Sequence, residues 1–288
     1  MAQVKIIAGR IASLSYKFAN EQGIHLIPVN IMIGEKTIKD DDDLKARKFL
    51  RDMPNLEVIP STGVPSHGEL LKAYKEATKD SDQALHVSVS SKLSNFYSRG
   101  IVASKALKKE GKDIQVFDTG TAVSMQGMFA YMATQFSRQG DAIEKILSKL
   151  EKLRDERRIV EYGVINTLKY LEKNGRIGKA QAWLGTIFSF KPIISAKDGV
   201  LEPVGKVRTD PQALEFVVKK VHEDIERTKA RNVEVMYDYG INDEFLRKEV
   251  NPRIMKEFNA KVISFNQISS AIACHLGPEV WGVCVKLE

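Results

Sequence analysis

The fold of the chain is decided by residues 84–118, which read ALHVSVSSKLSNFYSRGIVASKALKKEGKDIQVFD. The segment starts with a short apolar strand at Ala84–Val89, continues into a helix over Asn95–Lys109 and ends in a second buried strand at Ile114–Asp118. Strands that alternate with helices are typical of a parallel sheet, because the helix returns the chain to the start of the next strand. The segment therefore predicts an α/β fold.

The same alternation extends through the first half of the chain. Apolar patterns predict further strands at Val4–Ala8 and His25–Ile33. Helices are expected at about 13–20, 44–53, 66–78, 122–137 and 141–156. Ser66 with Glu69, and Asp141 with Glu144, have the spacing of a capping box at the start of two of these helices. Residues 1–160 are therefore predicted to form a parallel-sheet domain with helices on both faces.

The pattern changes after Arg157. We expect strands at 159–165, 233–239, 261–267 and 281–285, and a hairpin at 193–202 that turns at Lys-Asp-Gly. Helices are expected from Asn166 or Thr167 to Asn174-Gly175, from Asp210 to about Arg227, and from about Glu244 to Phe258. Residues 161–288 are therefore predicted to form an α+β domain that packs against the first, with a ligand cleft between the two.

The bulk composition excludes several classes of protein. The 288 residues carry 44 basic and 37 acidic side chains, a net charge of +7, but the two signs are intermixed on expected helix faces, so we expect no nucleic-acid partner. Cys274, Cys284 and the five histidines show no metal-ligand spacing, so we expect no metal and no cofactor. No apolar stretch approaches the ~18–20 residues of a membrane span, and the N-terminus has no signal-peptide pattern. The expectation is a reduced, cytoplasmic, soluble protein without stable membrane insertion.

Two hydroxyl-rich turns are the candidate functional motifs. The first spans Pro60–Leu70 and reads PSTGVPSHGEL, and the second spans Val89–Tyr97 and reads VSSKLSNFY. Each is expected to open a helix, where unpaired N–H groups and the positive end of the helix dipole favour an anion. If both turns lie at the ends of neighbouring parallel strands, they form a site for a carboxylate or a phosphate.

Four blocks of sequence, in order along nearly the whole chain, resemble those of the DegV family. Residues 60–69 resemble its P-T-T-S-Q-P-S-P-G-E block, and residues 90–97 resemble its S-S-K-L-S-G-T-Y block. Residues 168–180 are similar to L-x-Y-L-x-x-G-G-R-I-G-K-A, with Lys191-Pro192-Ile193 following. Residues 275–282, which begin at His275, are similar to H-T-G-P-G-x-x-G.

This resemblance implies a two-domain, non-catalytic protein that binds a long-chain fatty acid, such as hexadecanoate, between its domains. It also implies that the fatty acid is presented to a separate fatty acid kinase, which forms the acyl phosphate. Thr62 and Ser94 match the positions expected to bind the carboxylate. His275 and Arg176 match positions near the head group or the kinase-facing surface, and Ser91 is a further expected ligand contact.

The chain departs from the family pattern at three places. Ala8-Gly9-Arg10 replaces a T-D-S block, Gly63-Val64 replaces S-Q, and Leu276-Gly277-Pro278-Glu279 replaces T-G-P-G. These departures bear on which acyl chain fits and on whether a kinase recognises the protein. The acyl slot is expected to be lined from both halves by the following side chains: Phe96, Met125, Met128, Phe129, Ile187, Phe188 and Phe190.

A chain of about 16 carbons gains roughly 12 kcal/mol in gross transfer free energy at ~0.8 kcal/mol per methylene, so the tail would dominate affinity. The alternative function is a serine-dependent acyl hydrolase, with Ser94 or Ser91 as nucleophile and His275 as base. Neither serine lies in a G-x-S-x-G motif, and no acid is clearly placed to orient His275. Gly175–Lys179 lacks the spacing of a phosphate-binding loop, which speaks against a phosphotransferase.

Overall fold

The computed structural model describes residues 3–184 and 190–288. Its first sheet has four parallel strands in the order β2-β1-β6-β7. These strands are β1 (Lys5–Gly9), β2 (Ile24–Ile27), β6 (Gln83–Ser88) and β7 (Asp113–Asp118). The predicted parallel sheet is therefore confirmed, and β6 and β7 lie where the segment 84–118 places them.

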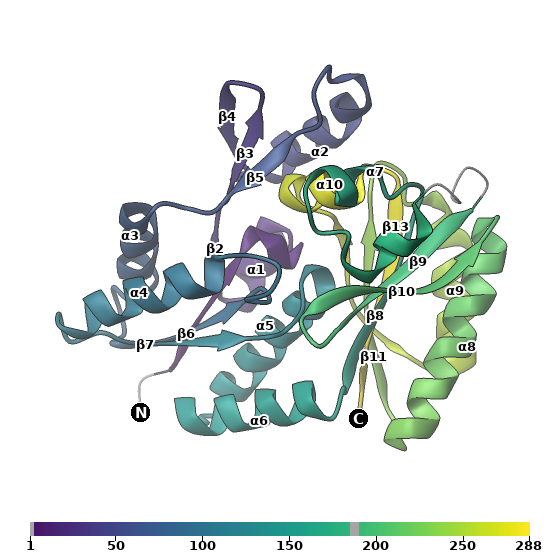
Figure 1. The fold of residues 1–288 in the computed structure, drawn as a ribbon. Helices are drawn as coiled ribbons and strands as arrows, with labels where there is room; N and C mark the ends of the chain where they lie inside the picture. The colour runs from purple at the N-terminus through teal and green to yellow at the C-terminus, as the bar shows by residue number, and fades with distance from the viewer. Residues whose placement is uncertain (1–2, 185–189) are drawn as a thin grey trace.

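Helices cover both faces of this sheet (Figure 1). One face packs against α3 (His67–Ala77) and α4 (Phe96–Lys108), and the other against α5 (Val123–Arg138) and α6 (Ile143–Asp155). The capping box of α3 is present, since the Ser66 side chain accepts the Glu69 N–H and the Glu69 carboxylate accepts the Ser66 N–H. The capping box predicted for α6 is wrong, because Asp141 forms ion pairs with Lys145 and Lys149 instead.

A small antiparallel sheet, which the sequence patterns did not predict, projects from the first half beside α2 (Asp43–Asp52) (Figure 1). Its strands are β3 (Asn30–Ile33), β4 (Lys36–Lys39) and β5 (Ser61–Gly63), in the order β4-β3-β5. The single strand expected over residues 25–33 is divided at Pro28, which has no N–H to donate to a ladder. Thr62 lies on β5 opposite Ile31, so only the second hydroxyl-rich turn follows a strand of the parallel sheet.

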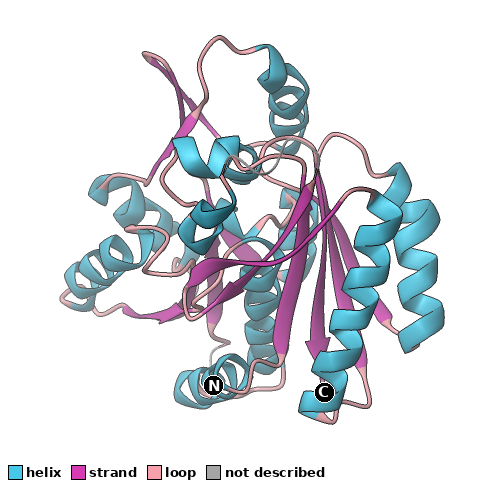
Figure 2. Cartoon of the chain, turned by 45° about the vertical axis from the view of Figure 1, so that its right-hand side comes forward, coloured by secondary structure: helices cyan, strands magenta, loops and turns pink. Residues whose placement is uncertain are grey.

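The second half forms a mixed six-stranded sheet in the order β10-β9-β8-β13-β11-β12. The strands are β8 (Ile159–Ile165), β9 (Lys191–Lys197), β10 (Val200–Val207), β11 (Val233–Tyr239), β12 (Lys261–Gln267) and β13 (Val280–Leu287). Among the described strands of this sheet, only β11 and β12 pair in parallel, and β13 lies between β8 and β11. One face is covered by α8 (Asp210–Thr228) and α9 (Asn251–Phe258), the latter preceded by a π-helical turn at Leu246–Val250 (Figure 2).

Helix α5 lies between the two larger sheets and joins the halves. Its buried side chains, among them Met128 and Phe129, pack in one core with Ile6 of β1 and with Met236 and Cys284 of the six-stranded sheet. Gly127 allows the close approach of the chain before α1 (Tyr16–Gln22), since a Cβ there would stand 2.8 Å from the Ala12 carbonyl oxygen. The predicted boundary between residues 160 and 161 stays a prediction, with β8 beginning at Ile159.

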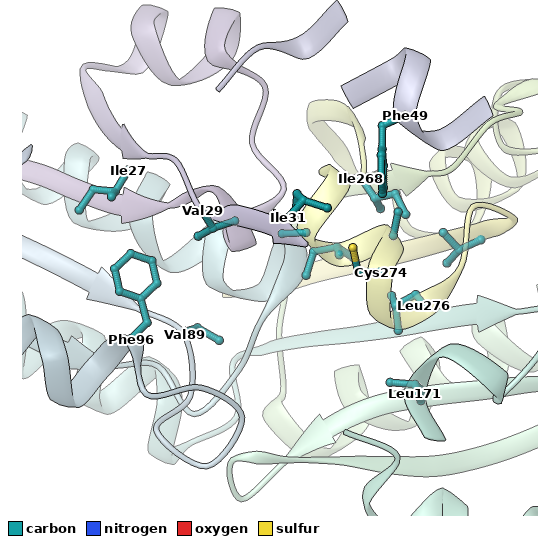
Figure 3. Close-up of a cluster of buried hydrophobic side chains, with 14 of the residues drawn as sticks. Ile27, Val29, Ile31, Phe49, Val89, Phe96, Leu171, Ile268, Cys274 and Leu276 are labelled. Atoms are coloured by element: carbon teal, nitrogen blue, oxygen red, sulfur yellow. The ribbon is translucent and has the colours of Figure 1, made fainter. Parts of the chain in front are cut away.

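Helix α10 (Ser270–Leu276), which the sequence patterns also missed, crosses from the second half to the first. It packs against α2, β3, β5 and the short helix α7 (Lys169–Lys173). Figure 3 shows Cys274 and Leu276 of α10 in the same apolar cluster as Ile31 of β3 and Leu171 of α7. The head-group candidates therefore come from segments that are distant in sequence but share one core.

Arg10, one of the departures from the family pattern, holds the start of α10 in place. Its guanidinium is 1% exposed, with Nη2 2.6 Å from Asp43 Oδ1 and Nε 3.5 Å from Asp40 Oδ1. The other oxygen of Asp40 accepts the N–H of Ala271 at 3.1 Å. A buried charge needs such partners, so this cluster fixes α10 relative to the N-terminal sheets.

Candidate ligand site

A cavity lies between the two halves of the chain. It encloses about 920 Å³ of space free of protein atoms, its open mouth included. Much of its wall is apolar. The first half contributes Ile11, Val64, Val89, Leu93, Val123 and Met125. The second half contributes Leu171, Ile194, Leu201, Ala271, Ile272 and Leu276.

Thr62 and His275 form a hydrogen-bonded pair in the cavity wall. Thr62 Oγ1 lies 3.0 Å from His275 Nε2, which joins β5 to the last turn of α10. Within residues 3–184 and 190–288, His275 Nδ1 is buried without a hydrogen-bond partner. Burial, and then the nearby charge of Arg176, lowers the pKa of His275 to about 4, so the imidazole is neutral at pH 7.

Ser94 reaches the same cavity from the turn that follows β6. Its Oγ accepts the N–H of Phe96 at 3.2 Å, and its own N–H donates to the Ser90 carbonyl at 3.1 Å. The turn is therefore fixed by its own hydrogen bonds. An oxygen that already accepts a hydrogen bond can still donate its hydroxyl hydrogen, and that hydrogen has no acceptor in the described part of the chain.

Arg176 is exposed at the rim and contacts the Ser94 turn. Its Nε donates to the Leu93 carbonyl at 3.3 Å, and its Nη1 donates to the Asn174 carbonyl at 2.6 Å. These bonds hold a permanent positive charge beside Ser94, close enough to His275 to lower the pKa of that imidazole.

Asn174 is the residue that sequence reasoning missed. The sequence pattern predicts Asn174 only as the end of a helix, and this is confirmed, since Asn174 follows α7. Its side-chain amide also donates to the Pro60 carbonyl at 3.1 Å and to the Cys274 carbonyl at 2.8 Å. Asn174 thus connects the residue before β5, the residue before His275 and the loop of Arg176. An Asn-Gly pair after a short helix is a turn signal. The neighbouring sequence gives no sign that the Asn174 amide also binds distant carbonyl groups.

A buried carboxyl pair, Glu161 and Asp238, lies at the start of α5. Glu161 Oε2 accepts the Met125 N–H at 2.9 Å, and Asp238 Oδ1 accepts the Ser124 hydroxyl at 2.7 Å. Burial raises the pKa of both carboxyls, and the Asp238 charge raises that of Glu161 further. Glu161 also lines the cavity, so this part of the wall holds a carboxyl with a raised pKa.

Residues 3–288 match the family model described as an uncharacterised protein of the DegV family. The chain belongs to the DegV family. Protein DegV of Bacillus subtilis is 25% identical over 286 residues, which cover 98% of this chain and 98% of that protein. Its relationship to this DegV-family chain therefore extends over both sequences almost from end to end.

Solved structures of other DegV proteins have the same fold. A DegV family protein from Thermus thermophilus, described for its fatty acid binding, matches with a TM-score of 0.89 at 22% identity, and 100% of each chain is covered. A stearic acid-binding protein from Eubacterium ventriosum matches with a TM-score of 0.88 at 21% identity, covering 99% of this chain and 98% of that one. At these sequence identities, the similarity to the solved structures establishes only the fold of this DegV-family chain.

Four of the five expected site residues of this DegV-family chain line this cavity, namely Thr62, Ser94, Arg176 and His275. Their role in holding a ligand stays a prediction. Ser91 is exposed, is not among the lining residues, and donates its N–H toward the Asp118 carboxylate at 3.3 Å. The hydrolase alternative requires His275 to contact Ser94 or Ser91. The described hydrogen bond of His275 is formed with Thr62 instead.

Among the expected acyl-slot residues, Met125 lines the cavity, whereas Phe96, Met128, Phe129 and Phe190 do not. Phe96 is fully buried against His86, with ring centroids 5.2 Å apart, and Met128 and Phe129 belong to the core around α5. The Phe190 ring lies instead against Lys206 and Arg208. The remaining two, Ile187 and Phe188, lie outside the described residues.

Two further observations concern the described residues alone. No group of three or more His, Cys, Asp or Glu side chains there is arranged to hold a metal ion. No helix among them combines the length and the apolar character that a membrane crossing requires.

Proposed function

We propose that this DegV-family chain binds a long-chain fatty acid, with its carboxylate held by Thr62 and Ser94 and its tail in the apolar cavity. The observation that carries the proposal is the cavity itself, which joins these two hydroxyls, Arg176 and His275 to a largely apolar wall. The fatty acid binding of the Thermus thermophilus and Eubacterium ventriosum proteins, which share the fold, supports the same ligand class.

The chemistry divides between the tail and the head group. Each buried methylene contributes about 0.8 kcal/mol of transfer free energy, so the tail supplies most of the affinity. A carboxylate loses several kcal/mol of hydration on burial unless hydrogen bonds replace the water. Two hydroxyl donors and the Arg176 guanidinium, which stands at the rim, replace that water and partly neutralise the charge.

The tautomer of His275 determines what Thr62 offers the ligand. With the proton on Nε2, the imidazole donates to Thr62 Oγ1, and the Thr62 hydroxyl hydrogen is directed elsewhere, to the carboxylate. The depressed pKa of His275 keeps the imidazole uncharged at neutral pH. In this proposal His275 positions Thr62 and carries no catalytic role.

We further propose that the chain acts as a non-catalytic carrier that presents the fatty acid to a separate kinase, which forms the acyl phosphate. Ser94 and Arg176 support this role because they line both the acyl cavity and a neighbouring surface hollow. Lys92 lines the same hollow, so two cations lie where a phosphate donor would approach the carboxylate.

Solvent extraction of the purified protein, followed by mass spectrometry, tests the ligand. We expect a near-stoichiometric long-chain fatty acid, and the double variant Thr62→Ala/Ser94→Ala should carry much less of it. Ser91→Ala is the matched control, since Ser91 lies outside the cavity wall, and it should carry the wild-type amount. A wild-type protein that is empty and takes up no added fatty acid would refute the proposal. Full loading of the double variant would refute the head-group assignment alone.

A further inference from the structure

A second cavity lies against the acyl cavity and shares part of its wall. Met125 and Ala196 line both cavities. The second wall also carries charged side chains, among them those of Lys92, Asp118, Arg154 and Asp198. It encloses about 1070 Å³ of atom-free space, its open mouth included. Residues that face two cavities form the partition between them, so Met125 and Ala196 separate the acyl cavity from a second space with charged side chains in its wall.

The conformation of the first turn of α5 fixes Met125 in this partition. Its backbone N–H donates to Glu161 Oε2 at 2.9 Å, and its side chain is 5% exposed. Val123, two residues earlier, has a φ of 54°, a left-handed conformation that is costly for a β-branched residue. The buried carboxyl pair and the strained turn together direct Val123 and Met125 into the cavity wall.

We infer that Met125 forms the end wall of the acyl cavity and sets the longest fatty acid that the chain binds. This inference rests on the proposed function. Thr62, Ser94, Arg176 and His275 are absent from the lining of the second cavity, so a tail that starts at these residues meets the partition before it enters that space. Met125 is the larger side chain of the partition and Ala196 the smaller, so the methionine controls the opening.

Because the partition closes the acyl cavity, we predict a limit to the length of the fatty acid that binds. Each methylene within the apolar cavity raises affinity roughly fourfold, the equivalent of the transfer free energy of one methylene. A tail longer than the cavity must bend or displace Met125, so affinity stops rising at that length. Met125→Ala removes the larger part of the partition and lets a longer tail extend toward the second cavity, which also contains Phe129 and Ile159.

The test measures dissociation constants for saturated fatty acids of 12 to 22 carbons with the wild type, Met125→Ala, Ala196→Leu and Met128→Ala. Met128→Ala is the matched control, because it removes the same side chain one turn later from a site that is fully buried in the core and lines neither cavity. We expect Met125→Ala to move the optimal length upward by two or more carbons. Ala196→Leu should move it downward, and Met128→Ala should leave it unchanged.

The inference is overturned if Met125→Ala has the optimum of the wild type, or if Met128→Ala shifts the optimum equally. If Met125→Ala does not fold, Ala196→Leu decides: an unchanged optimum overturns the inference, and a shorter one supports it. A wild type that binds no fatty acid of any length refutes the proposed function and the inference with it. A wild type that binds fatty acids with no limit up to 22 carbons overturns the inference alone.

Discussion

Thr62→Val is the substitution that most directly probes the head-group site. Valine has nearly the shape of threonine and the β-branched form that suits a strand, so β5 should persist and only the hydroxyl is lost. Two consequences follow from the structure. The carboxylate loses one charge-assisted donor, and His275 Nε2 loses the partner that lies 3.0 Å away.

The two losses have different sizes and different readouts. A hydrogen bond to a charged group contributes about 1.5–3 kcal/mol, so the dissociation constant for hexadecanoate should rise roughly tenfold to 150-fold. An unpartnered imidazole N–H in a buried site costs about 1–3 kcal/mol of unfolding free energy in the ligand-free protein. Displacement of a fluorescent fatty acid measures the first quantity, and urea denaturation of lipid-stripped protein measures the second.

Thr62→Ser is the matched control, since it keeps the hydroxyl and removes only a methyl group. It should bind within a few-fold of the wild type. The reasoning is refuted if Thr62→Val binds hexadecanoate within twofold of the wild type while Thr62→Ser does the same. If only the stability changes, Thr62 supports His275 without contacting the ligand.

Two further predictions concern Asn174 and the buried histidines. Asn174→Ala removes the amide that donates to Pro60 and Cys274, so both stability, by about 2–3 kcal/mol, and fatty-acid affinity should fall; an unchanged affinity would separate Asn174 from the site. Burial lowers the pKa of His86 to about 3 and that of His275 to about 4, below the usual pKa of about 6.5 for histidine. The unfolded chain therefore takes up protons below pH 6.5 that the native protein does not, and stability should fall as pH drops from 6.5 toward 4, by about 2 kcal/mol for each histidine at pH 5. Urea denaturation at pH 7 and pH 5 measures this loss, which should be smaller in His275→Asn; equal stability of the wild type at both pH values would contradict it.

Local patterns were sufficient for the regular strands of the chain. The strands β8, β11 and β12 have the predicted bounds, because each is an apolar run delimited by loop residues. Pro28 divides the expected strand at 25–33, which the breaker rule for proline could have indicated. Strand β5 has three residues, too few for any period to show.

The parts of the site that local patterns missed depend on contacts between distant segments. Helix α10 is buried on nearly every side, so its seven residues show no amphipathic stripe, although Ser269 accepts the Ile272 N–H as an N-cap. The role of Asn174 depends on residues 114 and 100 positions away along the chain. Only the resemblance to the family assigns His275 and Thr62 to the same site, since no spacing rule joins residues 213 positions apart.

The position of β13 determines when the site can form during synthesis. Strand β13 lies between β8 and β11 but follows both in the sequence, so the sheet of the second half stays in two parts until β13 has left the ribosome. Helix α10, which carries His275, immediately precedes it. The parallel sheet of the first half has all its strands by residue 118 and can form much earlier. Until α10 and β13 have been synthesised, the apolar cavity wall that the first half contributes has no complete partner from the second half.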